Sequence, residues 1–380
     1  MKTFQLHYKD VISSNTFSPE IIPFKPNLVL FFGGRDFLNE TQIIKKIREA
    51  FPEAILTGCS TSGEISGTNV YDQSLTLTAV KFESTKIMYR EENIGDFQNG
   101  IEAGKALALK LANKELRHVF VLSEGLHVNG TELVTGMRDN LPEGVNVTGG
   151  LAGDGADFNK TLIISNAGEV KSNIITAIGF YGDQIKIGYG SFGGWDSFGV
   201  ERSVTKSEGN VVFEIDNTPA LELYKSFLGE QAKNLPSSGL LFPLNMRIET
   251  DGEPVVRTIL AVDEQKQSLT FAGDIPEGSY IKLMKANIDR LINGAEKAAR
   301  VSVDPLGQNK ADLAILISCV GRKLVLKQLI EEEVEAVQEI VGDKTTLTGF
   351  YSYGEIAPFL KGTRCELHNQ TMTITTFTEV

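Results

Sequence analysis

A segment of strand, helix, strand and glycine-rich turn occurs three times along the 380-residue chain, and this repetition restricts the fold more than any other feature. Each copy begins with a short apolar run typical of a buried strand, then shows a helical pattern and a second strand. The copies span residues 28–65, 119–154 and 313–356. The first and third share Thr-Gly and Gly-Glu-Ile at identical offsets, while the middle copy keeps Thr-Gly and a Gly-Asp one position closer. Such repetition predicts a fold assembled from similar units.

Between the copies, the apolar period changes from 3.6 residues to 2. Residues 74–79 alternate between polar and apolar side chains, as do the stretches around Ile163, Ile178 and Ile187. This alternation is typical of strands with one buried face. We therefore expect an α/β fold with mixed sheets, in which antiparallel strands are added to repeated strand-helix-strand units, rather than a doubly wound parallel sheet.

The length of the chain predicts more than one domain. Gly190, Gly193, Gly194 and Gly199 surround the only tryptophan, Trp195, and Thr218-Pro219 has the residue types that begin a helix. We place the boundary near residue 200, which gives predicted domains 1–200 and 201–380. The same glycines would also suit a packed turn between strands.

Composition and charge argue against several classes of partner. The formal net charge of -12 repels phosphate backbones and anionic lipids, so neither nucleic acid nor a membrane is expected to bind. The N-terminus lacks the apolar core of a secretory signal, and no apolar run is long enough to span a bilayer. The three cysteines are widely spaced and odd in number, which favours neither a disulfide framework nor a thiolate zinc site. A cytoplasmic location is expected.

The glycine-rich turns that end the three copies are candidate ligand sites, because glycine lets backbone amides approach a ligand closely. They lack the lysine of a phosphate-binding loop and the spacing of a dinucleotide fingerprint. Their hydroxyls and single carboxylates would suit a polar small molecule that carries an amine, and tight turns that only pack the repeats together explain the pattern equally well. The candidate ligand-binding residues, on these turns and on the loop before residue 130, are Ser60, Thr61, Ser62, Glu64, Asn129, Asp154, Tyr351, Tyr353 and Glu355.

Cysteine and histidine offer few chemical sites. Cys59 stands at a strand end among hydroxyls, but no histidine lies near it in sequence to act as a base, so a buried structural thiol is expected. The four histidines are too scattered to predict a zinc site. His127 lies in the loop before residue 130 and His368 at the entry of the final strand, where either could contact a ligand. No pair of carboxylates is placed as an acid and a base, so no catalytic residue is predicted.

The motifs together resemble the FIST family, named for F-box and intracellular signal transduction proteins. The resemblance covers residues 25 to 378. It is carried by residues 58–65, 129–136, 148–154, 208–210, 219–224, 349–358 and 367–373. The resemblance implies a sensory module that binds small ligands such as amino acids and is often fused to, or encoded beside, a signalling output. Some stand-alone bacterial members of the family are described as haem-linked nitric oxide sensors that act on a histidine kinase in trans.

Three hypotheses follow from these residues and from the resemblance. The first is a signalling module that binds an amino-acid-like metabolite and passes the signal to a separate partner, such as a histidine kinase, because the chain ends soon after the last motif. The second is a haem-binding nitric oxide sensor in which His127 or His368 ligates the iron. The third is a hydrolase built around Cys59 with a base distant in sequence.

Overall fold

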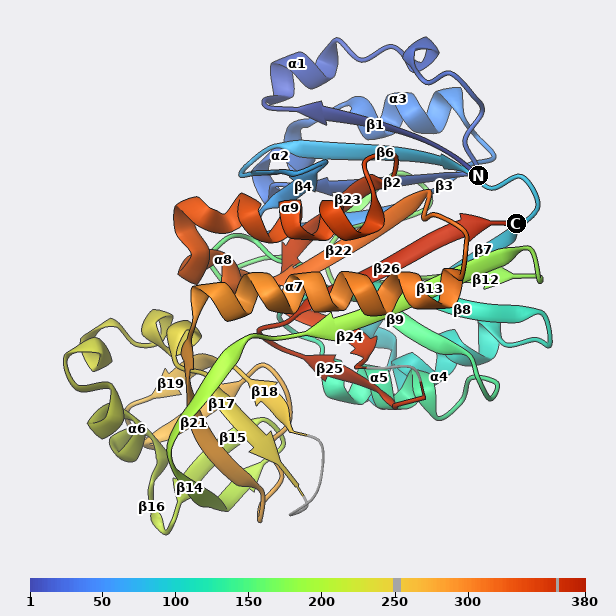
Figure 1. The fold of residues 1–380 in the computed structure, drawn as a ribbon. Helices are drawn as coiled ribbons and strands as arrows, with labels where there is room; N and C mark the ends of the chain where they lie inside the picture. Colours follow the sequence, from blue (N-terminus) through green and yellow to red (C-terminus); the bar gives the residue numbers. More distant parts are fainter. Residues whose placement is uncertain (249–253, 360–361) are drawn as a thin grey trace.

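The computed structural model describes residues 1–248, 254–359 and 362–380. Three six-stranded sheets form the main body, and a smaller unit built on an eight-stranded sheet extends from it at the lower left of Figure 1. The sheet of this smaller unit is called the smaller sheet, although it has more strands than the other three. No helix in these residues is long and apolar enough to cross a membrane.

Each sheet of the main body is centred on the two parallel strands of one repeat. The first has the order β1-β6-β2-β3-β10-β11, with bounds Lys2–Tyr8, Leu75–Lys81, Leu28–Gly33, Ile55–Ser60, Ile163–Ile164 and Val170–Lys171. The second has the order β25-β24-β9-β8-β12-β7, with bounds Cys365–His368, Gly354–Pro358, Asn146–Leu151, Leu116–Ser123, Ile174–Tyr181 and Lys86–Asn93. The third has the order β13-β26-β22-β23-β4-β5, with bounds Ile185–Phe192, Met372–Glu379, Leu313–Cys319, Thr346–Ser352, Glu64–Ser66 and Asn69–Tyr71.

The repeats exchange hairpins in a closed cycle. The hairpin β4–β5 follows the turn of the first copy, yet it pairs with β23 of the third copy. In the same way β24–β25 leaves the third copy and pairs with β9 of the second, and β10–β11 leaves the second copy and pairs with β3 of the first. Every sheet is thus completed by a different repeat, so no repeat has a complete sheet of its own.

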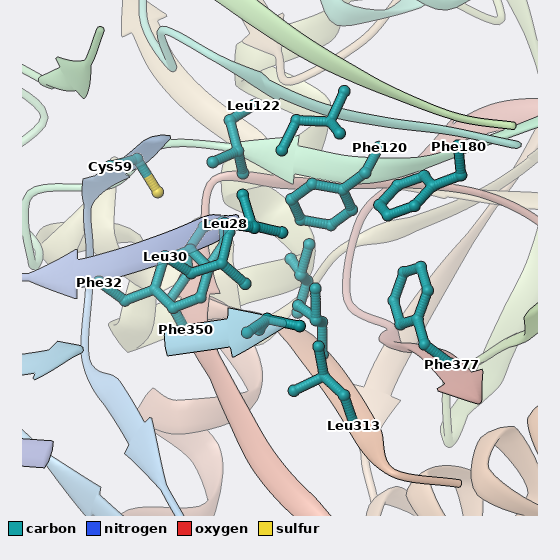
Figure 2. Packing of buried hydrophobic residues seen from close by; sticks show 14 of the residues in the cluster. Leu28, Leu30, Phe32, Cys59, Phe120, Leu122, Phe180, Leu313, Phe350 and Phe377 are labelled. Atoms are coloured by element: carbon teal, nitrogen blue, oxygen red, sulfur yellow. The ribbon is translucent and has the colours of Figure 1, made fainter. Parts of the chain in front are cut away.

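The inner faces of the three sheets meet in one apolar cluster (Figure 2). Leu30 of β2, Phe120 of β8 and Leu313 of β22 all belong to it, and each is at most 2% exposed. Cys59 lies at its edge, buried as expected. Close packing of this kind makes the centre sensitive to any change in side-chain volume.

Helices cover the outer face of each sheet. They follow the sheets in order as two short helices, α2 (Arg35–Glu40) and α3 (Ile43–Ala50), then α4 (Gly100–Leu111) and α5 (Gly130–Arg138), then α7 (Ile288–Val303) and α9 (Ile330–Val341). The helical pattern of the sequence that begins at Asn39 fits one helix, but the structure has two, because the backbone of Thr41 is extended. In the third copy the sequence pattern fits one long helix near residues 325–340, but the structure has a short helix, α8 (Val320–Leu326), before α9.

The repeated Thr-Gly has a structural cause in all three copies. A Cβ atom added to Gly58, Gly149 or Gly349 would lie within 2 Å of a carbonyl oxygen on the neighbouring parallel strand. Only glycine allows that approach. The threonine before each glycine forms a hydrogen bond with a threonine of another sheet. The three buried threonine pairs therefore connect the three sheets in a cycle. They are Thr57 with Thr176 at 3.0 Å, Thr148 with Thr375 at 2.9 Å, and Thr348 with Thr78 at 2.9 Å.

The smaller sheet has the strand order β18-β17-β21-β14-β15-β20-β19, with β16 paired to β15. The bounds are Val255–Arg257, Leu244–Arg247, Tyr280–Ala286, Trp195–Glu208, Val211–Ile215, Ser268–Phe271 and Ile259–Asp263, and Thr218–Pro219 for β16. The helix α6 (Ala220–Leu228) packs on this sheet, begins directly after Thr218-Pro219 as the sequence predicts, and ends at Gly229. The boundary placed at residue 200 falls inside β14, which runs unbroken through that position.

The predicted fold class is confirmed. The sheets are mixed, with parallel pairs inside each repeat and antiparallel strands around them.

Candidate ligand-binding site

The three glycine-rich turns lie together, as their shared position at strand ends suggests. The Ser62 amide donates a hydrogen bond to the Tyr351 carbonyl at 2.8 Å, and the Tyr351 amide donates one to the Gly63 carbonyl at 2.8 Å. The middle turn joins them through Gly153, whose amide donates to the Ser60 carbonyl at 3.0 Å. The candidate residues on the turns are therefore neighbours in space.

Two glutamates occupy equivalent places beside these turns. Glu64 accepts hydrogen bonds from the Thr61 hydroxyl and from the Ser74 hydroxyl at 2.5 Å. Glu355 accepts them from Ser352 at 2.6 Å and from the Thr371 hydroxyl at 2.9 Å. Burial raises the pKa of Glu64 to about 7 and the pKa of Glu355 to about 8.

The third carboxylate of the turns, Asp154, is also held by the protein. It forms an ion pair with Arg35 at 2.9 Å and accepts a hydrogen bond from the Tyr353 hydroxyl. Tyr351 donates its hydroxyl to Glu333 at 2.6 Å. These polar groups of the turns are thus bonded to other groups of the protein. Their role as ligand contacts stays a prediction.

Asn129, the remaining candidate residue, does not lie at the glycine-rich turns but at the start of α5. It caps α5 by accepting the amides of Thr131 at 3.0 Å and Glu132 at 3.3 Å. Its amide nitrogen donates to the Asp274 carboxylate at 2.7 Å. Asp274 follows β20 in the smaller sheet, so this bond joins the main body to that sheet.

Asp274 lines a cleft of about 730 Å³ between the two parts of the molecule. Its lining residues include members of β18, β25 and α5, and β18 contacts β25. Its size falls in the range of small-molecule sites, and most of its walls are apolar. The described residues that line it are Thr131, Phe192, Met246, Arg247, Ile248, Pro254, Val255, Arg257, Asp274, Pro276, Phe359, Thr363, Arg364 and Glu366.

Arg257 is the most unusual of these residues, since a guanidinium that is 3% exposed needs compensation. Among the described residues, it donates hydrogen bonds to carbonyl oxygens, those of Asp274 at 3.1 Å, Val256 at 3.3 Å and Leu367 at 3.1 Å. Burial lowers the pKa of Arg257 to about 10, so the group is charged at neutral pH. Within the described part of the chain, no carboxylate forms an ion pair with it.

The cleft is lined by further charged residues besides Arg257 and Asp274. Arg364 is exposed at the rim and takes part in none of the ion pairs that the described residues form. Glu366 pairs with Arg138 at 2.9 Å, and Arg247 pairs with Glu201 at 2.6 Å. Chemically, the cleft offers guanidiniums for an anion, the Asp274 carboxylate for a cation, and apolar walls for a side chain.

Of the two histidines proposed as haem ligands, neither lines the cleft, and His368 lies behind Phe359, which does. The His127 side chain is 67% exposed and contacts Glu124 at 3.1 Å. His368 is buried, with its Nε2 at 2.8 Å from the Ala357 carbonyl and its ring against Phe359. Burial lowers the pKa of His368 to about 4. Ligation of haem by His127 or His368 stays a prediction.

The structure gives no geometric support to a nucleophile at Cys59 or to a metal site among the described residues. Burial raises the pKa of the Cys59 thiol well above its usual value, which opposes a thiolate nucleophile. Across residues 1–248, 254–359 and 362–380, no group of three His, Cys, Asp or Glu side chains is arranged to hold a metal ion.

Sequence reasoning missed most of the cleft. Arg257, Asp274, Arg364 and Glu366 lie outside the repeats and belong to no motif, and only the structure brings them together. One signal was available, since Arg257 interrupts an apolar run that reads Val-Val-Arg-Thr-Ile-Leu.

Residues 27–218 match the FIST N domain and residues 220–358 match the FIST C domain. The chain belongs to the FIST family. FIST domains are associated with sensory roles in signal transduction. The two matches meet at residues 218 and 220, in β16 and at the first residue of α6.

One relative and two solved structures were compared with this FIST protein. The uncharacterized protein MJ1623 of Methanocaldococcus jannaschii is 26% identical over 365 residues, which cover 83% of this chain and 66% of that protein, so only part of the relative is matched. The crystal structure of a chorismatase is 9% identical, with a TM-score of 0.35 over 99% of this chain and 98% of that one. A cyanuric acid hydrolase from A. caulinodans is 7% identical, with a TM-score of 0.38 over 99% of both chains. Likenesses this weak support no statement about chemistry.

Proposed function

We propose that this FIST protein is a sensory module that binds an amino-acid-like metabolite in the cleft between the main body and the smaller sheet. The observation that carries the proposal is Arg257, a buried guanidinium that lines the cleft without a carboxylate partner among the described residues. Burying a guanidinium that forms no ion pair is costly, and the carboxylate of a ligand would add to the attraction that the charges of Glu366 and Asp274 exert on it.

The remaining groups of the cleft match the other parts of a zwitterion. Asp274 lies beside Arg257 and offers a carboxylate to an ammonium group. Apolar side chains such as Met246, Val255 and Phe359 provide walls for an aliphatic or aromatic body. One oxygen of Asp274 accepts the Asn129 amide, which fixes the direction of the carboxylate.

We further propose that a separate protein detects the ligand-bound state. The cleft is lined by both parts of the chain, so a ligand that contacts Arg257 and Thr131 would favour one arrangement of the smaller sheet against α5. A partner that binds one arrangement better would receive the signal. The partner class expected is a histidine kinase or another signalling output protein that acts in trans.

A melting-temperature screen against free amino acids tests this proposal. A ligand present at 100 times its Kd should stabilise the protein by about 2.7 kcal/mol. Arg364→Met should reduce that stabilisation, because it removes a cation from the rim of the cleft. Arg300→Met, on an exposed position of α7, is the matched control and should leave it unchanged. Failure of the whole panel to stabilise the wild-type protein would contradict the proposal.

A further inference from the structure

A second cavity, of about 340 Å³, lies inside the smaller sheet and is separate from the cleft. It opens where β14 bows away from β21. Phe198 pairs with Leu283, and the next paired residues are Arg202 and Ile281, so four steps along β14 correspond to two along β21. Bulges of this kind often lie next to binding sites because they redirect side chains. Here the bulge leaves Val200 70% exposed at the mouth of the cavity.

The walls of this cavity are apolar. Tyr224 and Phe227 come from one face of α6, because residues three apart on a helix lie side by side. Leu244 and Leu283 belong to the apolar cluster beneath them. The Tyr224 hydroxyl is satisfied by the Phe242 carbonyl at 2.7 Å, so its ring acts as a plain wall. An apolar body that filled this space would gain contacts that the empty cavity lacks.

The charged groups of the cavity are both cationic. Arg202 stacks on Phe227, with 5.1 Å between its guanidinium carbon and the ring centroid, and pairs with Asp216 at 2.8 Å. Lys282 is half-buried and has no ion pair in the described part of the chain. The nearby Glu201 is engaged by Arg247 at 2.6 Å. None of the described residues that line the cavity is acidic.

From the bulge, the apolar walls and the unpaired Lys282, we infer that this cavity is a second binding site, which accepts a small organic anion with an aromatic or branched aliphatic body. The body lies between the bulge and α6, and the anionic group contacts Lys282. The site lies within residues 198–283 and contacts none of the groups proposed to hold the metabolite in the cleft. It would let the smaller sheet respond to an apolar anion independently of the cleft.

The test uses two fluorescent probes on the full chain. One is 8-anilinonaphthalene-1-sulfonate, and the other is N-phenyl-1-naphthylamine, which has the same aromatic body without the charge. The sulfonate probe should show saturable binding to the wild-type chain, and the variants identify the part that belongs to this cavity. Lys282→Met should weaken its binding roughly fivefold and leave the neutral probe unchanged. Lys285→Met, an exposed lysine on the same strand, is the matched control and should affect neither probe.

A second variant places the probes in the molecule. Phe227 is 39% exposed, so Phe227→Ala is compatible with folding, which an unchanged far-ultraviolet circular dichroism spectrum would verify. Loss of this wall should weaken the binding of both probes. Three results would overturn the inference: no saturable binding of the sulfonate probe, unchanged binding in Phe227→Ala, or equal effects of Lys282→Met and Lys285→Met.

Discussion

Single residues in this protein are restricted most where two strands or two charges come close. The glycine after threonine in each repeat is the clearest case, because a carbonyl oxygen of the adjacent strand occupies the space of a side chain. Glu64 and Glu355 are the electrostatic counterpart, since both are buried beside turns that they help to hold. Each case predicts a measurable effect on stability.

Gly349→Ala should lower the free energy of unfolding by about 3 kcal/mol or more, because the new Cβ would stand 1.8 Å from the Leu316 carbonyl oxygen. Gly193→Ala is the control, since its Cβ would meet no atom closer than 3.6 Å. The control should stay within about 1 kcal/mol of the wild type. Urea unfolding of both variants measures the difference, and equal stabilities would contradict the steric explanation.

Stability should fall as the pH rises from 6.5 to 8. The pKa of Glu355 is raised to about 8, above its unfolded value, so the folded state binds the extra proton and loses this advantage as that proton leaves. Below pH 6.5, His118 and His368 oppose this trend. Burial lowers their pKa values to about 3 and about 4, so the unfolded state binds more protons at these residues, and their contribution makes stability rise with pH.

Glu355→Gln should remove about 1.5 kcal/mol of this decline, because the amide keeps the shape and cannot titrate. Urea unfolding at pH 6.5 and pH 8 supplies the two values for each protein. The exposed Glu332→Gln is the comparison and should retain the decline of the wild type. If Glu355→Gln and the wild type decline equally, Glu355 does not hold a proton in the folded state.

The N-terminus of helix α5 differs from that of the neighbouring helix α4. Both helices are capped by an asparagine, Asn129 for α5 and Asn99 for α4. Only Asn129 also donates to a residue of the smaller sheet, Asp274. The two caps therefore form a natural pair for separating helix stability from the geometry of the cleft.

Asn129→Ala and Asn99→Ala should each cost about 1 kcal/mol of stability through the lost cap. Only Asn129→Ala should also weaken metabolite binding, because Asp274 then loses the amide that orients it. Chemical unfolding and calorimetric titration measure the two effects. Equal binding by both variants would show that the cap bond does not position the cleft.

The elements also show how far the sequence could be interpreted. The repeat predicted β2, β8 and β22 and placed the three turns at equivalent strand ends, which the structure confirms. It could not reveal the exchange of hairpins, because β4 pairs with a strand almost 300 positions away and local periodicity carries no information on such a partner. The break at Thr41 was missed for a related reason, since the helical pattern continues across it.

For the whole molecule, the cyclic exchange of hairpins joins three repeats into one body, and the smaller sheet is attached beside it. The cleft arises only from that attachment, as Arg257 and Asp274 come from the smaller sheet while Thr131 comes from α5. Sequence motifs indicated the turns because those residues are adjacent along the chain. The cleft residues are spread over more than 200 positions, so no spacing rule could have gathered them.

The most direct test of the account is calorimetric titration of the best ligand from the amino-acid screen into three proteins: the wild type, Asp274→Asn and Glu355→Gln. Asp274→Asn keeps an oxygen for the Asn129 amide but removes the charge that faces the cleft. The account predicts binding that is at least tenfold weaker in Asp274→Asn, about the loss of one charged hydrogen bond, and unchanged in Glu355→Gln. Unchanged binding in Asp274→Asn with lost binding in Glu355→Gln would contradict the account and place the ligand at the turns.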